Sequence, residues 1–170
     1  MSDPNDPATG QRTRTFTWQD PLPVAEAGRR MSGLDLFRAL IAGELSAPPI
    51  AQALGFRLAE AEAGRVVFTG MPAEYHYNPI GVVHGGLAAT LLDSAMGCAV
   101  HSTLPAGVGY TTLEIKVNYI RAITVQTGEL RAEGTVIHAG SRTATAEGRL
   151  TGTDGKLYAH GTTTCLILRP

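Results

Sequence analysis

The second half of the chain alternates apolar and polar residues, a pattern that predicts strands with one buried face. In residues 112–121, for example, apolar side chains occupy every second position from Leu113 to Tyr119. A turn at Gly64 joins two earlier short strands, and Asp154-Gly155 is a two-residue hairpin signal before the last strand. The expected strands cover residues 56–58, 66–68, 112–121, 129–138, 144–150 and 156–168. Because short links join the last four, we predict an antiparallel meander.

One expected helix has no polar face. It begins with the sequence GLAATLLDSAMGCAV and runs from about Gly86 to Ser102, with Asp93 as its only charged residue. A helix that is hydrophobic all round must be surrounded by protein. The order of short strands, buried helix and meander therefore predicts an α+β hotdog fold, in which a curved antiparallel sheet wraps around one long buried helix.

The N-terminal residues follow other patterns. Residues 1–30 contain four prolines without periodicity, so we expect a flexible arm or one draped over the surface. Residues 31–47 predict a helical extension, because a Ser-x-x-Asp start signal at Ser32 precedes apolar residues at helical spacing. The proline pair that follows is expected to stop this helix. Residues 48–170 are expected to form the hotdog domain.

Asp93 is the first candidate for chemistry. An ionised carboxylate in an apolar setting is costly unless it is paired or hydrogen-bonded, and aspartate is a poor residue for the middle of a helix. One interpretation is structural, with the carboxylate bonded to nearby backbone or to a partner chain. The favoured interpretation is a general base or nucleophile in a dry cleft.

The segment before this helix supplies a second candidate. His84-Gly85-Gly86 stands at the expected helix start, where unpaired N–H groups carry a partial positive charge and glycines allow close approach. Such donors stabilise the oxyanion that forms during acyl transfer. An ordinary glycine-rich loop would also explain the glycines. Asn78, which precedes them, has an alternative role as a turn residue before Pro79.

Together these residues form the pattern N-x5-HGG-x6-D, which resembles the hotdog-fold acyl-CoA thioesterases of the phenylacetate-degradation (PaaI-like) branch. The resemblance covers about residues 48 to 168. It implies that Asp93 is the catalytic carboxylate and that the backbone of Gly85 donates to the thioester carbonyl. His84 and Asn78 would shape that end of the site.

Further groups are expected to position the attacking water and to bind coenzyme A. Thr112 matches a family position where a hydroxyl helps to place the attacking water, and spacing does not separate it from Thr111. Gly86, Arg121 and Arg142 are candidates for contacts with coenzyme A, the arginines through its phosphates. Solvated charge at a strand edge explains the two arginines as well.

Composition limits the partners and the compartment. The 14 basic and 15 acidic residues include no basic cluster, so neither nucleic acid nor an anionic membrane is expected as a partner. Cys98, Cys165 and the histidines lack metal-ligand spacing, so no metal is expected. The N-terminus resembles no secretory signal and no stretch approaches about 18 apolar residues. We therefore expect a cytoplasmic protein.

The expected function is hydrolysis of acyl-CoA thioesters to the free acid and coenzyme A. Asp93 would activate a water or attack the thioester directly, while the helix N-terminus stabilises the oxyanion. No metal or redox cofactor is needed, because coenzyme A enters as part of the substrate. The motifs of serine hydrolases, P-loops and dinucleotide folds are missing. The alternatives are an enoyl-thioester hydratase or dehydratase that pairs His84 with Asp93, and a non-catalytic acyl-CoA-binding protein.

A homo-oligomer is also expected. Charged residues make up 17 % of the chain, against roughly 25 % in a typical domain, which favours a surface partly hidden by other copies. One sheet around one helix leaves unpaired edges, which a symmetric partner can cover. We expect a dimer or a dimer of dimers, that is, a homotetramer. The resemblance further implies that Asp93 of one chain faces the His84-Gly85 segment of another.

Overall fold

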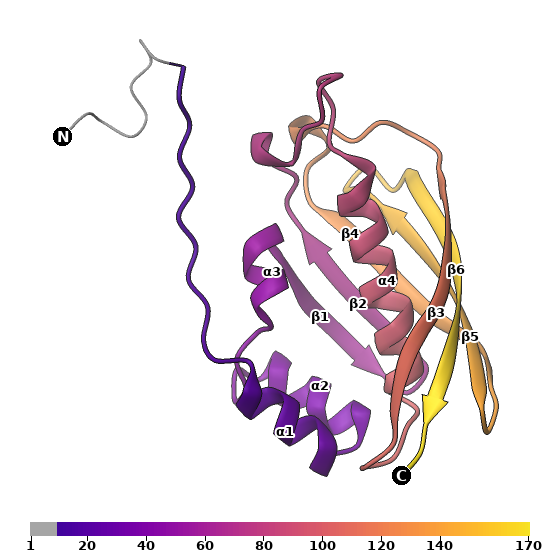
Figure 1. The fold of residues 1–170 in the computed structure, drawn as a ribbon. Helices are drawn as coiled ribbons and strands as arrows, with labels where there is room; N and C mark the ends of the chain where they lie inside the picture. The colour runs from indigo at the N-terminus through magenta and orange to yellow at the C-terminus, as the bar shows by residue number, and fades with distance from the viewer. Residues whose placement is uncertain (1–9) are drawn as a thin grey trace.

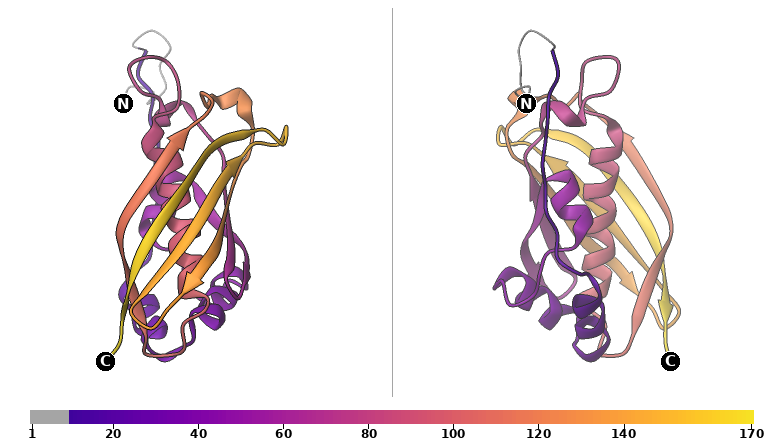
Figure 2. Two further views of the ribbon diagram at one scale, coloured as in Figure 1. Left: turned by 90° about the vertical axis from the view of Figure 1, so that its right-hand side faces the viewer. Right: turned by 60° about the vertical axis from the view of Figure 1, so that its left-hand side comes forward.

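The computed structural model describes residues 10–170, in which an antiparallel sheet curls around the helix α4 (Gly85–His101) (Figure 1; Figure 2). The strands are β1 (Phe56–Glu62), β2 (Arg65–Gly70), β3 (Gly109–Tyr119), β4 (Leu130–Ala139), β5 (Thr143–Thr151) and β6 (Leu157–Leu168). The other helical elements are α1 (Leu22–Arg30), α2 (Gly33–Ile41), α3 (Pro49–Leu54) and the short 3-10 turns η1 (Glu74–His76) and η2 (Val125–Thr127). This arrangement confirms the predicted α+β hotdog fold.

The strands follow the order β1-β2-β4-β5-β6-β3, and every neighbouring pair is antiparallel. β4, β5 and β6 form the predicted meander, but β3 lies beside β6 at the far edge instead of beside β4. The reason is the link 120–129, which contains η2 and crosses the end of the sheet, so that β4 pairs with β2. The predicted four-stranded meander therefore has three strands, and β3 is an edge strand.

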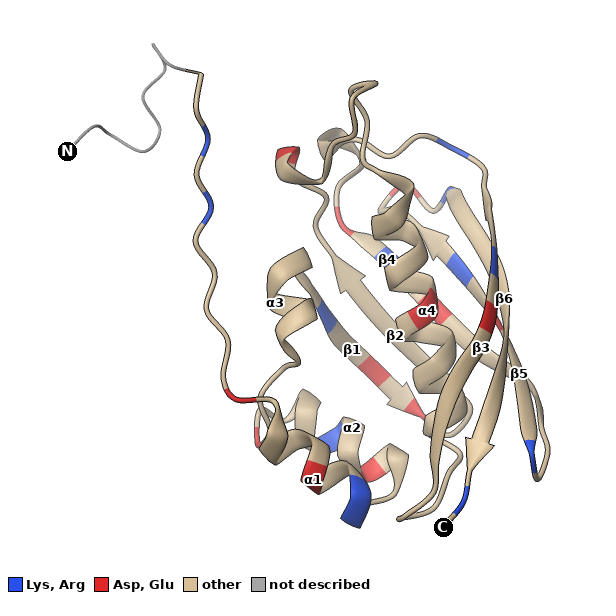
Figure 3. Cartoon of the chain, viewed as in Figure 1, with Lys and Arg blue, Asp and Glu red and all other residues tan. Residues whose placement is uncertain are grey.

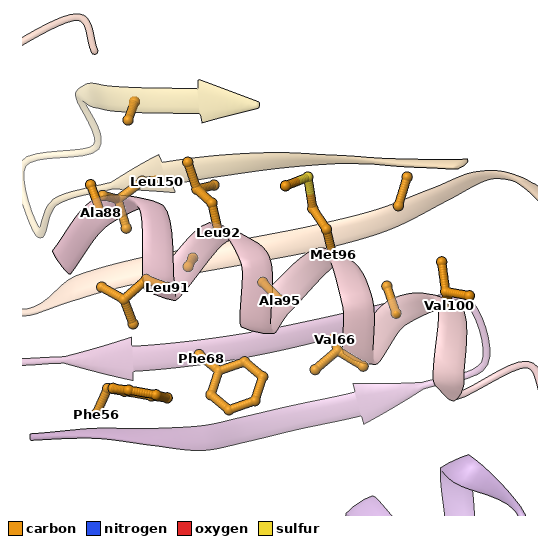
Figure 4. Close-up of a cluster of buried hydrophobic side chains, with 14 of the residues drawn as sticks. Phe56, Val66, Phe68, Ala88, Leu91, Leu92, Ala95, Met96, Val100 and Leu150 are labelled. Carbon is orange, nitrogen blue, oxygen red and sulfur yellow. The ribbon is translucent and has the colours of Figure 1, made fainter. Parts of the chain in front are cut away.

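Small residues on the strands bring the sheet close to α4. A Cβ at Gly134 would lie 2.3 Å from the carbonyl oxygen of Ala95, so only glycine permits this approach. Larger side chains fill the space beside the helix, where Phe56 and Phe68 pack near Leu91 (Figure 4). The buried residues of α4 are Leu87, Ala88, Leu91, Leu92, Ala95, Met96, Gly97, Ala99 and Val100.

The face of α4 that points away from the sheet is partly open along its first half. Residues of intermediate exposure there are Gly86, Ala89, Thr90, Asp93 and Ser94. The expectation that protein surrounds the helix on every side is therefore correct toward the sheet and wrong for this face of a single chain. Asp93 is the only acidic or basic residue of the helix apart from His101, as the single red segment of α4 shows (Figure 3).

Helix α1 forms within the segment that was expected to be an arm. Pro21 precedes it and Pro23 lies in its first turn, where proline fits because those N–H groups have no helical partner. Prolines thus begin a helix here instead of preventing one. Residues 10–20 are extended and exposed, as expected, and Arg14 ties them to α3 by donating to two carbonyls of its last turn. Residues 1–9 lie outside the described part of the chain.

Helix α2 begins as predicted but ends earlier. Ser32 caps it by accepting the backbone N–H three residues later at 3.2 Å. The helix stops two residues before Gly43, whose φ of +75° does not continue a right-handed helix. Pro48 and Pro49 therefore do not stop α2, and instead begin α3, with Pro49 in its first turn.

Candidate active site

Asp93 and Thr112 form the centre of the candidate site. Asp93 lies in the middle of α4 and is half-buried, and the hydroxyl of Thr112 on β3 donates to its Oδ1 at 3.1 Å. Thr111 is exposed on the other face of β3. The hydroxyl next to the carboxylate therefore belongs to Thr112, a choice that the spacing of the sequence left open.

The strand carries a β-bulge directly after this threonine. Thr112 pairs with Cys165 of β6, whereas Glu114 pairs with Thr164, which leaves Leu113 as an extra residue. A bulge changes which side chains face the sheet's interior, and bulges are common beside active sites.

Two polar groups near Asp93 stay uncharged at neutral pH. Burial raises the pKa of the Cys98 thiol to about 12 and raises that of the Tyr110 hydroxyl well above its usual range, and the Asp93 charge adds to both shifts. Tyr110 crosses the outer face of α4 at Gly97, where a Cβ would lie 2.8 Å from its hydroxyl oxygen. Because Cys98 is not a thiolate, the carboxylate is the group here that is suited to act as base or nucleophile.

The start of α4 offers a backbone donor. His84 is the N-cap, and its Nδ1 accepts the N–H of Gly86 at 2.8 Å. The N–H of Gly85, the first residue of the helix, has no acceptor within the helix, and no other acceptor for it is found among the described residues. The helix dipole adds a partial positive charge at this end. Gly85, and not Gly86, therefore has the N–H that is available to an oxyanion.

The loop before α4 is closed by Asn78. Its side-chain oxygen accepts the N–H groups of Ile80 and Val82 at 3.1 Å and 3.3 Å, so Asn78 does act as a turn residue. The N–H of His84 donates to the carbonyl of His76 at 2.8 Å, which joins the helix start to η1. Burial lowers the pKa of His76, and this neutral ring has a structural role.

A pocket of about 370 Å³ lies beside the start of α4. Gly85, Tyr119, Arg121 and Tyr158 line it together with apolar residues. The ring of Tyr119 packs against Gly85, 3.0 Å from the position that a Cβ would take there. Arg121 donates to the carbonyl of Leu157 while it lines this pocket. Of the two arginines singled out from the sequence, Arg121 is the one near the helix start.

The structure does not bring Arg142 to the same end of the chain. Its carbonyl accepts the N–H of Ile167 near the end of β6, whereas Arg121 bonds to Leu157 at the beginning of that strand. The ten residues between these points span about 33 Å of extended strand. The two arginines of one chain therefore cannot contact the same phosphate.

A smaller apolar pocket of about 180 Å³ lies between α4 and the α2–α3 segment. Cys98 contributes to its wall, and this thiol bonds to the Tyr110 hydroxyl. Cys98 follows Asp93 by five residues, or about 7.5 Å along the helix axis. The pocket therefore lies more than one helical turn beyond the carboxylate, which is not among its lining residues. Its other lining residues are Phe37, Leu40, Ala47, Pro48, Ala51, Arg57, Leu58 and Phe68.

Gly85 and Asp93 do not meet within one chain. They are eight residues apart on the same helix, and this spacing places them about 12 Å apart along its axis. A carbonyl under attack needs its oxyanion donor and its attacking atom each about 3 Å away. A single chain therefore does not hold both groups around one thioester carbonyl.

The other histidines take no part in this arrangement. Burial lowers the pKa of His101, which packs edge-on against Phe37, while His138 is exposed and His160 half-buried. Among residues 10–170, no three His, Cys, Asp or Glu side chains gather closely enough to hold a metal ion, and no helix is long and apolar enough to cross a membrane.

Sequence reasoning missed three neighbours of the site, namely Tyr110, Tyr119 and Cys98. The two tyrosines lie at the ends of β3 and reach α4 at Gly97 and Gly85. Glycine inside a helix lowers its stability and indicates that another group approaches closely. That signal predicts the approach, but only the pairing of β3 with β6 identifies the tyrosines.

Comparison with known proteins identifies the family of this chain. Residues 80–159, which include the glycine motif and Asp93, match the model of the family described as the Thioesterase superfamily. A candidate esterase of Pseudomonas aeruginosa is 30 % identical over 109 residues, which cover 63 % of this chain and 73 % of that protein. A candidate esterase of Halobacterium salinarum is 44 % identical over 69 residues, which cover 39 % of this chain and only 44 % of that protein. The chain belongs to the Thioesterase superfamily.

Solved structures extend this comparison to the whole fold. A candidate thioesterase from Ralstonia eutropha, described as a phenylacetic acid degradation-related protein, is 29 % identical with a TM-score of 0.69 and covers 76 % of this chain and 98 % of that chain. A Streptococcus mutans protein in a structure bound to acetyl CoA is 27 % identical with a TM-score of 0.61 and covers 68 % and 92 %. The resemblance to the phenylacetate-degradation branch is therefore confirmed.

Proposed function

We propose that the protein hydrolyses acyl-CoA thioesters to the free acid and coenzyme A. The observation that carries this proposal is the half-buried Asp93 carboxylate, bonded to Thr112, on a helix whose first N–H group, that of Gly85, has no acceptor among residues 10–170. Membership of the Thioesterase superfamily supports hydrolysis of a thioester. A base or nucleophile combined with an oxyanion donor is what such acyl transfer requires.

In this mechanism Asp93 removes a proton from a water as the water oxygen attacks the thioester carbonyl carbon. The carbonyl π electrons move to the oxygen, where the N–H of Gly85 stabilises the charge. Collapse of the tetrahedral intermediate breaks the C–S bond, and the proton returns to the departing thiolate of coenzyme A. Thr112 holds the carboxylate or the water in place. Direct attack by Asp93, followed by hydrolysis of the resulting anhydride, is the alternative route through the same groups.

We infer that each site is shared between two chains. The distance between Gly85 and Asp93 requires the donor of one chain to meet the carboxylate of another. The edge strand β3 offers a surface for this contact, because Leu113 and Tyr119 on it are both 57 % exposed and its outer edge is unpaired. A symmetric partner on this edge would also cover the open face of α4.

Coenzyme A is proposed to bind in the pocket beside the start of α4. The Streptococcus mutans relative bound to acetyl CoA supports a ligand of this class. Within the pocket, Tyr119 offers an aromatic ring for stacking and Arg121 a guanidinium for phosphate. Arg142 would reach a bound coenzyme A only from another chain.

The acyl group is proposed to enter the apolar pocket beside Cys98. Its volume of about 180 Å³ is similar to that of a cavity of about 150 Å³ that binds benzene. The pocket therefore favours short acyl groups or a single aromatic ring over a long acyl chain.

The test measures thiol release from acetyl-, butyryl-, phenylacetyl- and palmitoyl-CoA, together with the absorbance of an enoyl-CoA. Thiol release that is fastest with the butyryl or phenylacetyl substrate supports the proposal. A change in enoyl absorbance without thiol release would identify a hydratase or dehydratase, and binding without either would identify an acyl-CoA-binding protein. The position of His84 favours thiol release over hydration, because its Nδ1 is already bonded to the N–H of Gly86 in the helix cap.

A further inference from the structure

Thr163 on β6 is a buried residue that takes no direct part in the proposed chemistry. It is 1 % exposed, and its hydroxyl donates to the backbone carbonyl of Glu114 at 2.7 Å. Glu114 directly follows the bulge in β3. A side chain from the neighbouring strand therefore bonds to the backbone of β3 at the point where the pairing changes register.

This bulge decides which side chains of β3 face α4. With unbroken alternation, the face that carries Thr112 would also carry Glu114 and Lys116. The extra residue, Leu113, inverts the alternation, so both charged residues are exposed instead. The bulge thus allows Thr112 to face Asp93 without turning the two charges toward the helix.

A row of polar side chains connects Thr163 with the site. Cys165 pairs with Thr112, and burial raises the pKa of its thiol while hydrogen bonds with Thr163 and Thr112 oppose that rise. Thr112 in turn donates to Oδ1 of Asp93 at 3.1 Å. Cys165 therefore lies between the two threonines, across from Thr112 in the pairing and two residues after Thr163 on β6.

We propose that Thr163 is a positioning residue for thioester hydrolysis, since its hydroxyl holds the bulge that aims Thr112 at Asp93. This inference rests on the function proposed above. Thr163 itself is shielded from solvent, and loss of its hydroxyl removes this part-buried hydrogen bond to the Glu114 carbonyl. A displacement of about 1 Å in a positioning group lowers a rate by about 10²-fold in unfavourable cases.

The test compares two substitutions at this position. Thr163→Val keeps the shape of the side chain but removes the donor, and we expect kcat to fall about 10-fold or more while KM changes little. Thr163→Ser keeps the donor and should retain most of kcat. Thr69→Val is the matched control, because Thr69 is a buried threonine of β2 whose Oγ1 has no hydrogen-bond partner in the described part of the chain. This control should leave kcat unchanged.

A double-mutant comparison distinguishes positioning from a general loss of stability. If Thr163 acts through Thr112, then adding Thr163→Val to Thr112→Val causes little further loss of kcat, whereas independent effects multiply. Multiplying effects, or an unchanged kcat in Thr163→Val, would overturn the proposal. If the valine variant does not fold, Thr163→Cys replaces it, because a thiol is a weak donor of similar size. A kcat of the cysteine variant equal to that of Thr163→Ser would then overturn the proposal.

The wild-type protein separates this inference from the function on which it rests. A wild-type chain that releases no thiol from any acyl-CoA refutes the proposed function, and the positioning role falls with it. An active wild-type chain whose Thr163 variants behave like the Thr69→Val control refutes the positioning role alone.

Discussion

Asp93 lies among neutral neighbours. Burial keeps Cys98 and Tyr110 protonated nearby, and Thr112 supplies a hydroxyl to the carboxylate. Among the described residues, no lysine, arginine or histidine forms an ion pair with it. The carboxylate can therefore accept a proton, or attack a carbonyl carbon, without first breaking a salt bridge.

The first prediction concerns Asp93→Asn. The substitution is nearly isosteric, and the amide oxygen can still accept from Thr112, so the fold and the thermal midpoint should change little. Turnover in the thiol-release assay should fall by roughly 10²–10⁴-fold, the range for loss of a general base. A variant that retains normal turnover would exclude Asp93 from the mechanism.

The second prediction concerns Gly85→Pro. Gly85 is the first helical residue, a position that tolerates proline, and His84 before it has the extended backbone that a following proline requires. The helix should therefore form without the N–H. The rate should fall because the transition state loses about 3 kcal/mol of stabilisation. Gly85→Ala is the control that keeps the N–H while placing a Cβ near Tyr119. The alanine variant should lose less of the rate than the proline variant, and an intact rate in a folded proline variant would assign Gly85 a turn role only.

The residues of the motif could be recognised from the sequence because they lie close together in it. Their neighbours could not, because they depend on long-range pairing. The choice between Thr111 and Thr112 depends on a bulge that the alternating pattern does not reveal, and this bulge also leaves Leu113 exposed although the pattern placed it on the buried face. The separation of Arg121 from Arg142 likewise depends on the length of β6.

The elements themselves differ in how far local patterns determine them. α4 and the strands lie within a few residues of their expected bounds, because capping, apolar period and turn signals act locally. The place of β3 beside β6 is a choice among distant partners, and α1 was missed because prolines signal both loops and first turns of helices. Sequence patterns therefore predict elements better than they predict which elements become neighbours.

The third prediction concerns an ionic network across β1, β2 and β4. Glu60 bonds to Arg65 at 2.9 Å and to Arg131 at 2.6 Å, and Glu133 bonds to both arginines. Hydrogen bonds from Arg131 and then Arg65 lower the pKa of Glu60 from 4.5 to about 2. Because the folded pKa is the lower one, the network stabilises the fold above about pH 4.5, and this contribution is lost as the pH falls toward 2.

Urea unfolding of Glu60→Gln between pH 2 and pH 7 tests this dependence. The variant should be less stable than wild type at pH 7, by about 1 kcal/mol or less because the network is partly exposed. The difference should shrink as the pH falls below 4.5. Glu44→Gln, in the exposed loop after α2, is the control and should show no such trend. A difference that stays constant with pH would contradict the assignment.

The whole molecule leads to the fourth prediction, because the proposed site needs two chains. Asp93→Asn and Gly85→Pro each inactivate both sites of their own homodimer. When the two variants are mixed, partly denatured and refolded together, a mixed dimer combines the intact Asp93 of one chain with the intact Gly85 of the other. Random pairing should restore about a quarter of wild-type activity.

Light scattering and a tag on one variant provide the control for this mixing experiment. The tag verifies that mixed dimers form, and scattering gives the mass of the active species. Verified mixed dimers that stay inactive, or full wild-type activity at the 17.9 kDa mass of one chain, would contradict the shared site.

The pairing of β3 with β6 also orders events during synthesis. Val117 is made 44 residues before its partner Gly161, and at about 5–20 residues per second the ribosome needs several seconds to supply the partner strand. During that time β3 has no neighbour on either side, and its apolar residues Leu113 and Ile115 are available to other nascent chains. Closely spaced ribosomes on one mRNA therefore bring together the β3 strands of neighbouring nascent chains. These strands can pair with each other before β6 is made.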